Sequence, residues 1–253
     1  MKLQLNHISA GYDHPLILGA NATLDGGQLV ALLGRNGAGK STLLRHIAGL
    51  LPLLSGKVLV NGNEIHKMDE RQRAKLISVV STRKSRIPQL SAIEVIGLGR
   101  SPYTNLMGRL SAHDRTVVRE ALELVGIEHL AEKYVHQISD GENQRVMIAR
   151  ALAQDTPVIL LDEPTAFLDL PNRYDLALLL RRLAKERNKI IIFSTHDLDI
   201  AFQLCDQIML IQHQELITRP TEEMKSSGLI EALFSSEQVR LDPQTGAVHL
   251  SQS

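Results

Sequence analysis

A glycine-rich stretch, GRNGAGKST at positions 34–42, constrains the fold of this chain more than any other feature. It follows an apolar run at 29–33 and precedes LLRHIAGL, which has a helical pattern, so the order is strand, glycine loop, helix. Glycines allow such a loop to curl until consecutive backbone N–H groups point inward, where they hold phosphate oxygens against the positive end of the helix. The stretch predicts a nucleoside triphosphate site, with a glycine-rich turn that matches by chance as the alternative.

Two side chains in this stretch indicate how the triphosphate would be held. Lys40 carries an ammonium group that would reach the β- and γ-phosphates. The hydroxyl group of Ser41 would bind the Mg²⁺ ion that bridges those phosphates.

Composition limits the classes of protein to which the chain can belong. With 253 residues, 43% of them hydrophobic, it can form one large domain or a core with a subdomain. The 28 Lys and Arg residues balance the 28 Asp and Glu residues, which argues against nucleic acid as a partner because a phosphate backbone requires a basic excess. Cys205 is the single cysteine, so no internal disulfide is possible, and its apolar surroundings predict a buried thiol in a reducing cytosol.

Targeting and metal signals are weak in this sequence. Positions 1–8 alternate between polar and apolar residues like a strand, and there is no run of 18 apolar residues, so we expect a protein that is neither exported nor membrane-spanning. The ten histidines lack the spacing of structural zinc ligands, so the sequence does not predict such a site.

The first third of the chain predicts a small antiparallel sheet ahead of the glycine loop. Tyr12 lies in this part, and its ring either stacks on a nucleotide base or packs at the edge of the sheet. An Asn-Gly turn at Asn61 and Gly62 predicts a hairpin. A buried strand is expected at 76–80, and the range 92–153 has a helical pattern throughout.

Polar residues end two later strands. The apolar run 157–161 is followed by Asp162 and Glu163, and carboxylates at the end of a parallel strand lie where ligands bind in α/β sheets. Such a pair is costly unless a cation meets it, and Mg²⁺ with a nucleotide supplies one, although helix capping is an alternative. His196 follows the next strand, at 189–193, and is either structural or part of the same site.

Taken together, these motifs resemble the ATP-binding subunit of an ABC transporter over essentially the whole chain. Positions 34–42 match the Walker A loop, LLDEP at 160–164 the Walker B segment, ISDGE at 138–142 the signature, AFLD at 166–169 the D-loop, His196 the switch histidine and Tyr12 the adenine-stacking aromatic. A signature about twenty residues ahead of Walker B is close to unique to this family.

The resemblance implies an α/β fold: a P-loop NTPase core with a mixed sheet, a small antiparallel β subdomain and an all-helical signature subdomain at about 92–153, together forming a single ABC ATPase domain over 1–253. It implies a head-to-tail dimer in which each ATP lies between the Walker A loop of one copy and the signature of the other. Asp162 and Ser41 would hold Mg²⁺, Glu163 would activate the water, and His196 would touch the γ-phosphate. The implied nucleotide contacts are Tyr12, Gly34, Asn36, Gly37, Ala38, Gly39, Lys40, Ser41, Thr42, Ser139, Gly141, Glu142 and Asp169.

The chain departs from the family pattern at two places. Thr82 stands where a glutamine that senses the membrane partner is usual, and Gln89 comes seven residues later. Asp140 replaces a glycine of the signature. The loop after Thr82, with Pro88 and Leu90, and Tyr103 further on are expected to receive a cytoplasmic helix of the permease.

The run VIGLGRSPY at 95–103 resembles the subgroup that energises importers of iron-siderophore complexes, haem and cobalamin. The implied partners are membrane permease subunits, a second copy of this chain and, indirectly, a substrate-binding protein, and the implied location is the cytoplasmic face of the inner membrane. Alternatives are another ABC transporter ATPase, for example for zinc or manganese, a soluble ABC ATPase of DNA repair or translation, and a nucleotide-binding regulator without turnover.

Overall fold

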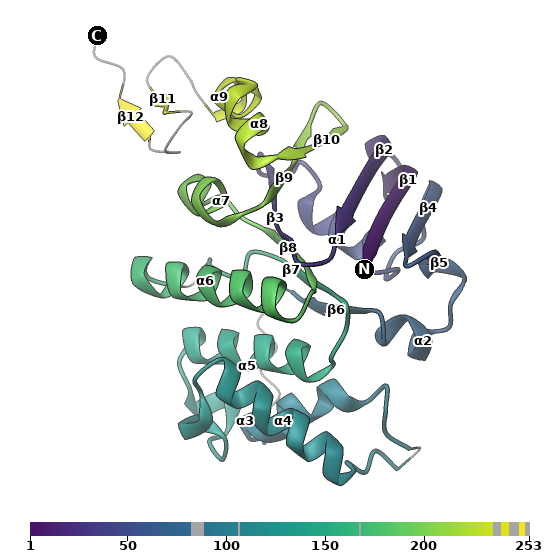
Figure 1. Ribbon diagram of the computed structural model, residues 1–253, viewed down its shortest axis with the longest axis vertical. Helices are drawn as coiled ribbons and strands as arrows, with labels where there is room; N and C mark the ends of the chain where they lie inside the picture. The colour runs from purple at the N-terminus through teal and green to yellow at the C-terminus, as the bar shows by residue number, and fades with distance from the viewer. Residues whose placement is uncertain (82–88, 106, 167, 235–238, 243–247, 251–253) are drawn as a thin grey trace.

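The computed structural model describes residues 1–81, 89–105, 107–166, 168–234, 239–242 and 248–250 (Figure 1). Its centre is a six-stranded sheet with the order β10-β9-β3-β8-β7-β6, in which β10 is antiparallel to β9 and the remaining neighbours are parallel. The strands are β3 (Leu29–Gly34), β6 (Ile77–Val80), β7 (Val158–Leu161), β8 (Ile190–Ser194), β9 (Gln207–Gln212) and β10 (Glu215–Pro220).

A four-stranded antiparallel sheet with the order β2-β1-β4-β5 lies beside it. Its strands are β1 (Lys2–Gly11), β2 (Pro15–Asp25), β4 (Ser55–Val60) and β5 (Asn63–Glu64). The hairpin expected at Asn61 and Gly62 is confirmed, since both residues have positive φ angles, 49° and 81°, as a two-residue turn of this type requires. Helix α1 (Lys40–Ile47) packs in the core that the two sheets share.

Alternating side chains of the central strands build two cores. Leu29, Ala31 and Leu33 of β3 face the core that contains helices α3 to α9, whereas Val30 and Leu32 face the core shared with α1 and the antiparallel sheet. Every residue of β3 is buried, which explains why a continuous apolar run rather than an alternating one marks this strand. The glycine loop therefore begins at the end of a strand that is fixed on both faces.

The range expected to be helical throughout holds three α-helices separated by turns. They are α3 (Ala92–Gly97), α4 (Ala112–Leu124) and α5 (Asp140–Ala153), with the 3-10 turns η2 (Leu98–Arg100), η3 (Glu128–Leu130) and η4 (Val135–Gln137). These helices and turns agree with the helical pattern expected for the whole range. At Gly99 a Cβ atom would lie 2.3 Å from the carbonyl oxygen of Arg150, so close packing of η2 on α5 requires glycine.

The remaining elements are a 3-10 turn, five α-helices and a pair of strands near the end of the described chain. They are η1 (Ile65–Lys67), α2 (Glu70–Ala74), α6 (Leu170–Glu186), α7 (Leu198–Leu204), α8 (Thr221–Ser226), α9 (Leu229–Phe234), β11 (Val239–Leu241) and β12 (Val248–Leu250). Strands β11 and β12 pair with each other as an antiparallel two-stranded sheet. Cys205 is buried as expected, and loss of hydration raises the pKa of its thiol.

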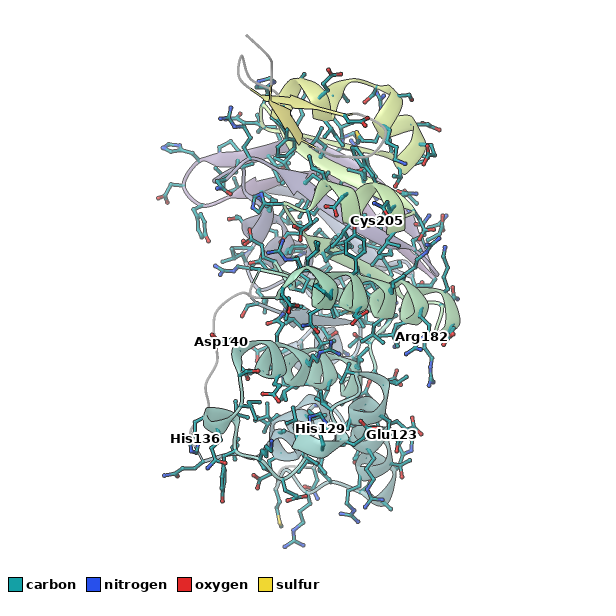
Figure 2. The ribbon with its side chains drawn as sticks, turned by 90° about the vertical axis from the view of Figure 1, so that its left-hand side faces the viewer. Glu123, His129, His136, Asp140, Arg182 and Cys205 are labelled. Carbon is teal, nitrogen blue, oxygen red and sulfur yellow. The ribbon has the colours of Figure 1, made fainter. Side chains whose placement is uncertain are left out.

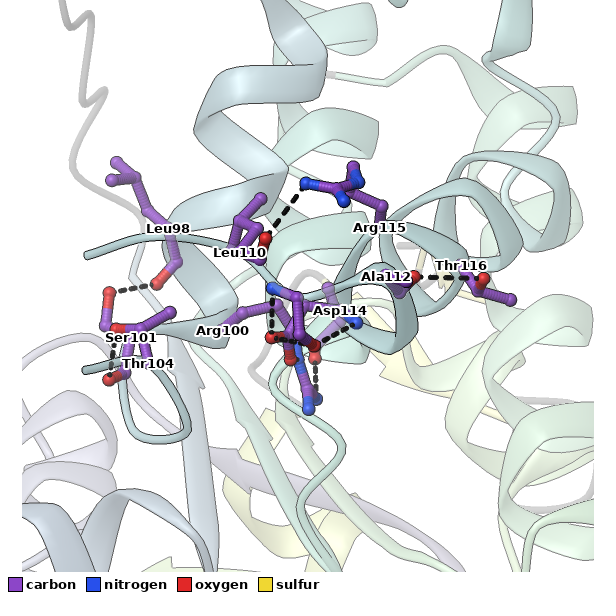
Figure 3. Close-up of polar contacts among 11 residues, drawn as sticks. Leu98, Arg100, Ser101, Thr104, Leu110, Ala112, Asp114, Arg115 and Thr116 are labelled. Carbon is purple, nitrogen blue, oxygen red and sulfur yellow. Dashed lines mark hydrogen bonds and ion pairs between the residues drawn. The ribbon is translucent and has the colours of Figure 1, made fainter. Parts of the chain in front are cut away.

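A buried ion pair joins three parts of the helical region (Figure 3). Arg100 of η2 donates from Nε to Asp114 Oδ1 at 2.9 Å and from Nη1 to the Ala153 carbonyl at the end of α5 at 2.7 Å. Asp114 also accepts hydrogen bonds from the Ser111 hydroxyl and backbone N–H at the start of α4. The two side chains of the ion pair are 4% and 7% exposed, so little water screens their interaction.

We expect Asp114→Asn to lower the free energy of unfolding by about 3–5 kcal/mol at neutral pH, because it leaves a buried guanidinium without its counter-charge. Hydrogen bonds from Ser111 and, to a lesser degree, the Arg100 guanidinium hold the pKa of Asp114 at about 2, against an ordinary value of 3.8. A depressed carboxyl pKa stabilises the fold above the ordinary value and loses this effect as the pH falls towards the folded one. Urea unfolding between pH 7 and pH 3 should show the difference narrowing below about pH 4, while Asp175→Asn, on the exposed face of α6, should change little.

Candidate nucleotide site

The glycine loop joins the end of β3 to the start of α1, as the sequence predicts. Gly37 and Gly39 have φ angles of 80° and 101°, values that side-chain-bearing residues rarely adopt. Because Gly39 is the N-cap of α1, no capping side chain competes for the first N–H groups of the helix. These N–H groups remain available for an anion, which the positive end of the helix favours.

The ammonium group of Lys40 lies inside its own loop. It donates to the carbonyl oxygens of Gly34 at 3.0 Å and Arg35 at 3.4 Å, and it lies 3.3 Å from His196 Nε2. Burial lowers the pKa of Lys40, and the negative charges of Glu163 and Asp162 partly oppose this change. The cation is thus held by the backbone where phosphate oxygens would enter.

Asp162 lies at the end of β7 and meets the start of α1. Its Oδ1 atom accepts hydrogen bonds from Ser41 Oγ at 2.9 Å and Ser194 Oγ at 2.8 Å, and the residue is 8% exposed. A hydroxyl oxygen beside a carboxylate is a hard-oxygen donor set of the kind that Mg²⁺ prefers. The residues present fit a magnesium ion shared by Ser41 and Asp162.

Glu163 and His196 lie next to each other because β7 and β8 are parallel neighbours. Glu163 Oε1 is 3.0 Å from His196 Nε2, and the two side chains are 32% and 41% exposed, so water reaches both. Glu163 has a φ angle of 48°, a left-handed conformation that is unfavourable for a residue with a side chain. Its backbone N–H donates to Ser194 Oγ at 2.8 Å, which helps to hold it there.

Three residues around this site received no role from the sequence. Ser194 bonds to both Asp162 and Glu163, as described above. Asp197 accepts a hydrogen bond from Thr165 Oγ1 and forms an ion pair with Arg173 Nη1, each at 2.9 Å. These contacts connect Thr165, which follows Glu163, and Arg173 of α6 to the start of α7. For Ser194, the sequence signal that could have indicated a role was a hydroxyl group on the last residue of a buried strand.

Tyr12 lies in the turn between β1 and β2, and the residue is 55% exposed. Its hydroxyl oxygen is 3.5 Å from Nη1 of Arg45 on α1. More than half of the Tyr12 surface is therefore open, and stacking on adenine stays a prediction, with packing at the sheet edge as its alternative.

The signature residues lie at the start of α5, in a different part of the molecule from α1 (Figure 1). Ser139 is the N-cap, and its backbone N–H and hydroxyl both donate to Glu142 Oε2 at 2.8 Å. These bonds lower the pKa of Glu142, so its carboxylate is ionised and engaged in capping. Asp140 begins the helix on the same side of the molecule as His136 (Figure 2), and Gly141 lies so close to Leu168 that a Cβ atom would meet its Cδ2 at 3.2 Å.

The other predicted residues have simpler positions. Asp169 is the N-cap of α6 and accepts a hydrogen bond from the backbone N–H of Asn172 at 3.2 Å. Thr82 and Pro88 lie outside the described residues. Leu90 packs against the larger core, whereas the residue Tyr103 is 37% exposed and its ring lies 4.0 Å from the Arg100 guanidinium carbon. Tyr103 is exposed enough for a partner to reach it, and the permease groove stays a prediction.

Among the described residues, no group of three or more His, Cys, Asp or Glu side chains is arranged to hold a metal ion by itself. None of the helices in the described part of the chain is both long enough and apolar enough to span a bilayer.

A glycine loop between a parallel strand and a helix, with a lysine in the loop and carboxylates at the end of a nearby strand, defines a P-loop nucleoside triphosphatase. The family model described as ABC transporter matches residues 17–166. The chain belongs to the ABC transporter family and carries its ATPase domain.

Known proteins resemble the chain over most of its length. It is 40% identical over 216 residues to the ABC transporter ATP-binding protein MJ0873 of Methanocaldococcus jannaschii, covering 85% of this chain and 74% of the relative. It is 32% identical over 246 residues to the iron(3+)-hydroxamate import ATP-binding protein FhuC of Bacillus subtilis, covering 96% and 91%. A solved structure, an inward-facing conformation described as a metal-chelate type ABC transporter, superimposes with a TM-score of 0.82 at 29% identity, covering 98% of this chain and 96% of that one.

Proposed function

We propose that this chain is the ATP-hydrolysing subunit of an importer for iron-siderophore complexes, haem or cobalamin. The observation that supports ATP hydrolysis best is the pair Glu163 and His196, in contact at 3.0 Å and open to water, beside the Lys40 loop. The proposed substrate rests on the name of the FhuC relative and on the metal-chelate type of the structural neighbour.

In the proposed mechanism, the N–H groups at the start of α1 and the Lys40 ammonium hold the β- and γ-phosphates. Glu163 accepts a proton from the attacking water, and His196 orients the γ-phosphate. Ser41 and Asp162 would hold Mg²⁺, which offsets phosphate charge when bound. Tyr12 packs against the adenine.

The signature would act on the ATP of a second copy. Ser139 and the start of α5 lie apart from α1 in one chain, so their predicted phosphate contacts require the head-to-tail dimer. In this proposal Asp169 also serves the dimer contact, and residues 1–253 form one ABC ATPase domain with its helical subdomain at about 92–153. The complex would lie on the cytoplasmic face of the inner membrane as a peripheral subunit of permease proteins, served indirectly by a substrate-binding protein and without a nucleic acid partner.

The test is to isolate the native membrane complex through a tag on this chain and to measure ATP turnover with added substrate. We expect an iron chelate, haem or cobalamin, presented with its binding protein, to stimulate turnover, because import couples substrate arrival to hydrolysis. Stimulation by zinc or manganese in place of these would support the alternative importer class. Recovery of the tagged chain with ribosomes or DNA and without a permease would contradict the proposal.

A further inference from the structure

The turn that carries Tyr12 begins at Gly11, where the structure leaves no room for a side chain. A Cβ atom at Gly11 would lie 2.2 Å from the carbonyl oxygen of His14 and 2.9 Å from the backbone nitrogen of Leu16. Only glycine fits such a tight turn, so Gly11 offers nothing but its backbone groups for attachment to the rest of the fold.

A buried histidine on α1 meets those backbone groups. His46 is 0% exposed, and its Nε2 atom lies 3.0 Å from both the backbone nitrogen and the carbonyl oxygen of Gly11. Its other ring nitrogen, Nδ1, is buried with no hydrogen-bond partner among the described residues. An apolar residue would fill this core position without leaving a polar atom unsatisfied, so packing alone does not explain a histidine here.

Two further contacts tie the same turn to the phosphate loop and its helix. Arg45, the neighbour of His46, approaches the Tyr12 hydroxyl, as described above. At the other end of the turn, Leu16 lies against Gly39: a Cβ atom added to Gly39 would be 3.2 Å from the Cβ atom of Leu16. The turn is therefore attached at both ends and at its ring to one rigid unit, the element that begins with Gly39 and Lys40.

We propose that His46 is a positioning residue that fixes the Tyr12 ring at a set distance from the phosphate loop. The proposal rests on the proposed function, in which ATP lies across both. More than half of the Tyr12 surface is exposed, so its own packing constrains it little, and the hydrogen bond between Gly11 and His46 Nε2 adds a constraint. A ring held in place before binding costs less to order when the base arrives, so His46 strengthens the part of ATP binding that depends on the base.

The test compares ATP with inorganic tripolyphosphate, which has the phosphates but no base, by isothermal titration calorimetry on the full chain without Mg²⁺. His46→Phe keeps a ring of similar size but cannot bond to Gly11. We expect it to weaken ATP binding by about tenfold, which is about 1.4 kcal/mol, and to leave tripolyphosphate binding unchanged.

Two comparisons separate positioning from general stability. His46→Gln places an amide nitrogen where Nε2 lies and should restore most of the ATP affinity, whereas the shorter His46→Asn should not. His46→Phe added to Tyr12→Ala should weaken ATP binding no further than Tyr12→Ala alone, because both changes remove the same interaction.

Equal losses for ATP and tripolyphosphate, additive losses in the double variant, or unchanged ATP binding in His46→Phe would each overturn the role of His46. If His46→Phe does not fold, the pair of His46→Gln and His46→Asn decides in the same way, with equal ATP affinities counting against the proposal. Failure of the unmodified chain to bind either ligand would instead contradict the proposed function.

Discussion

Replacing Glu163 with glutamine is expected to leave ATP binding intact and to lower ATP hydrolysis by roughly 10² to 10⁴-fold, the usual contribution of a general base. Glutamine keeps the length and the hydrogen-bonding reach of the side chain but removes the proton acceptor. Nucleotide binding should persist because the glycine loop and Lys40 make the phosphate contacts, and the negative charge of Asp162 still favours the charged form of Lys40 when that of Glu163 is removed.

The geometry around Glu163 explains why this position suits a base. Its left-handed backbone conformation and its bond to Ser194 aim the carboxylate towards His196 and solvent, while the neighbouring Asp162 points to Ser41. Two adjacent carboxylates thus have different surroundings, one buried between hydroxyl groups and one open to water. This separation allows one to hold a metal while the other accepts a proton.

The rate of phosphate release and the equilibrium binding of ATP should be measured on the same preparation. Glu186→Gln, at the exposed end of α6, is the matched control and should hydrolyse ATP at the unmodified rate. Because an isolated subunit can have low turnover without its permease, both variants should also be compared in the native complex. Full hydrolysis there by Glu163→Gln would show that another group is the base.

The strands and the phosphate loop could be predicted from the sequence because their signals are local. The apolar runs at β3 and β7 are buried along their whole length, and the residues that follow each run necessarily meet at the same edge of a parallel sheet. That rule was enough to expect Asp162, Glu163 and His196 in one place, and the structure brings them together.

Roles that depend on distant partners could not be predicted in this way. Ser194 bonds to the Asp162 carboxylate and the Glu163 backbone N–H, both more than thirty positions earlier, and the bond of His46 to Gly11 spans 35 residues. Neither contact leaves a pattern in a short window. The nucleotide contact of Glu142 stays a prediction, because it concerns the ATP of a second copy. Within one chain the Glu142 carboxylate accepts hydrogen bonds from Ser139, a local capping contact that the spacing of the two residues allows.

Adding Ser139→Arg to the Glu163→Gln variant is expected to abolish an ATP-dependent dimer, while each chain still binds ATP through Lys40. In the head-to-tail model, Ser139 lies against the γ-phosphate of the second copy, where a long side chain does not fit. Blocking hydrolysis first should accumulate the closed state, so that the loss of the dimer becomes visible.

Ser139 also caps α5, so the loss of its hydroxyl must be separated from the added bulk. Ser139→Ala in the same background is the matched control, because it removes the cap, at a cost of about 1 kcal/mol, without filling the interface. We expect size-exclusion chromatography with Mg²⁺-free ATP to show dimers for Glu163→Gln, weakened dimers with Ser139→Ala, and monomers with Ser139→Arg. Since Glu142 already places a negative charge beside this contact, some weakness is expected even before mutation, and the series should be repeated in the native complex. A stable ATP-dependent dimer carrying Ser139→Arg would show that α5 does not face the second nucleotide.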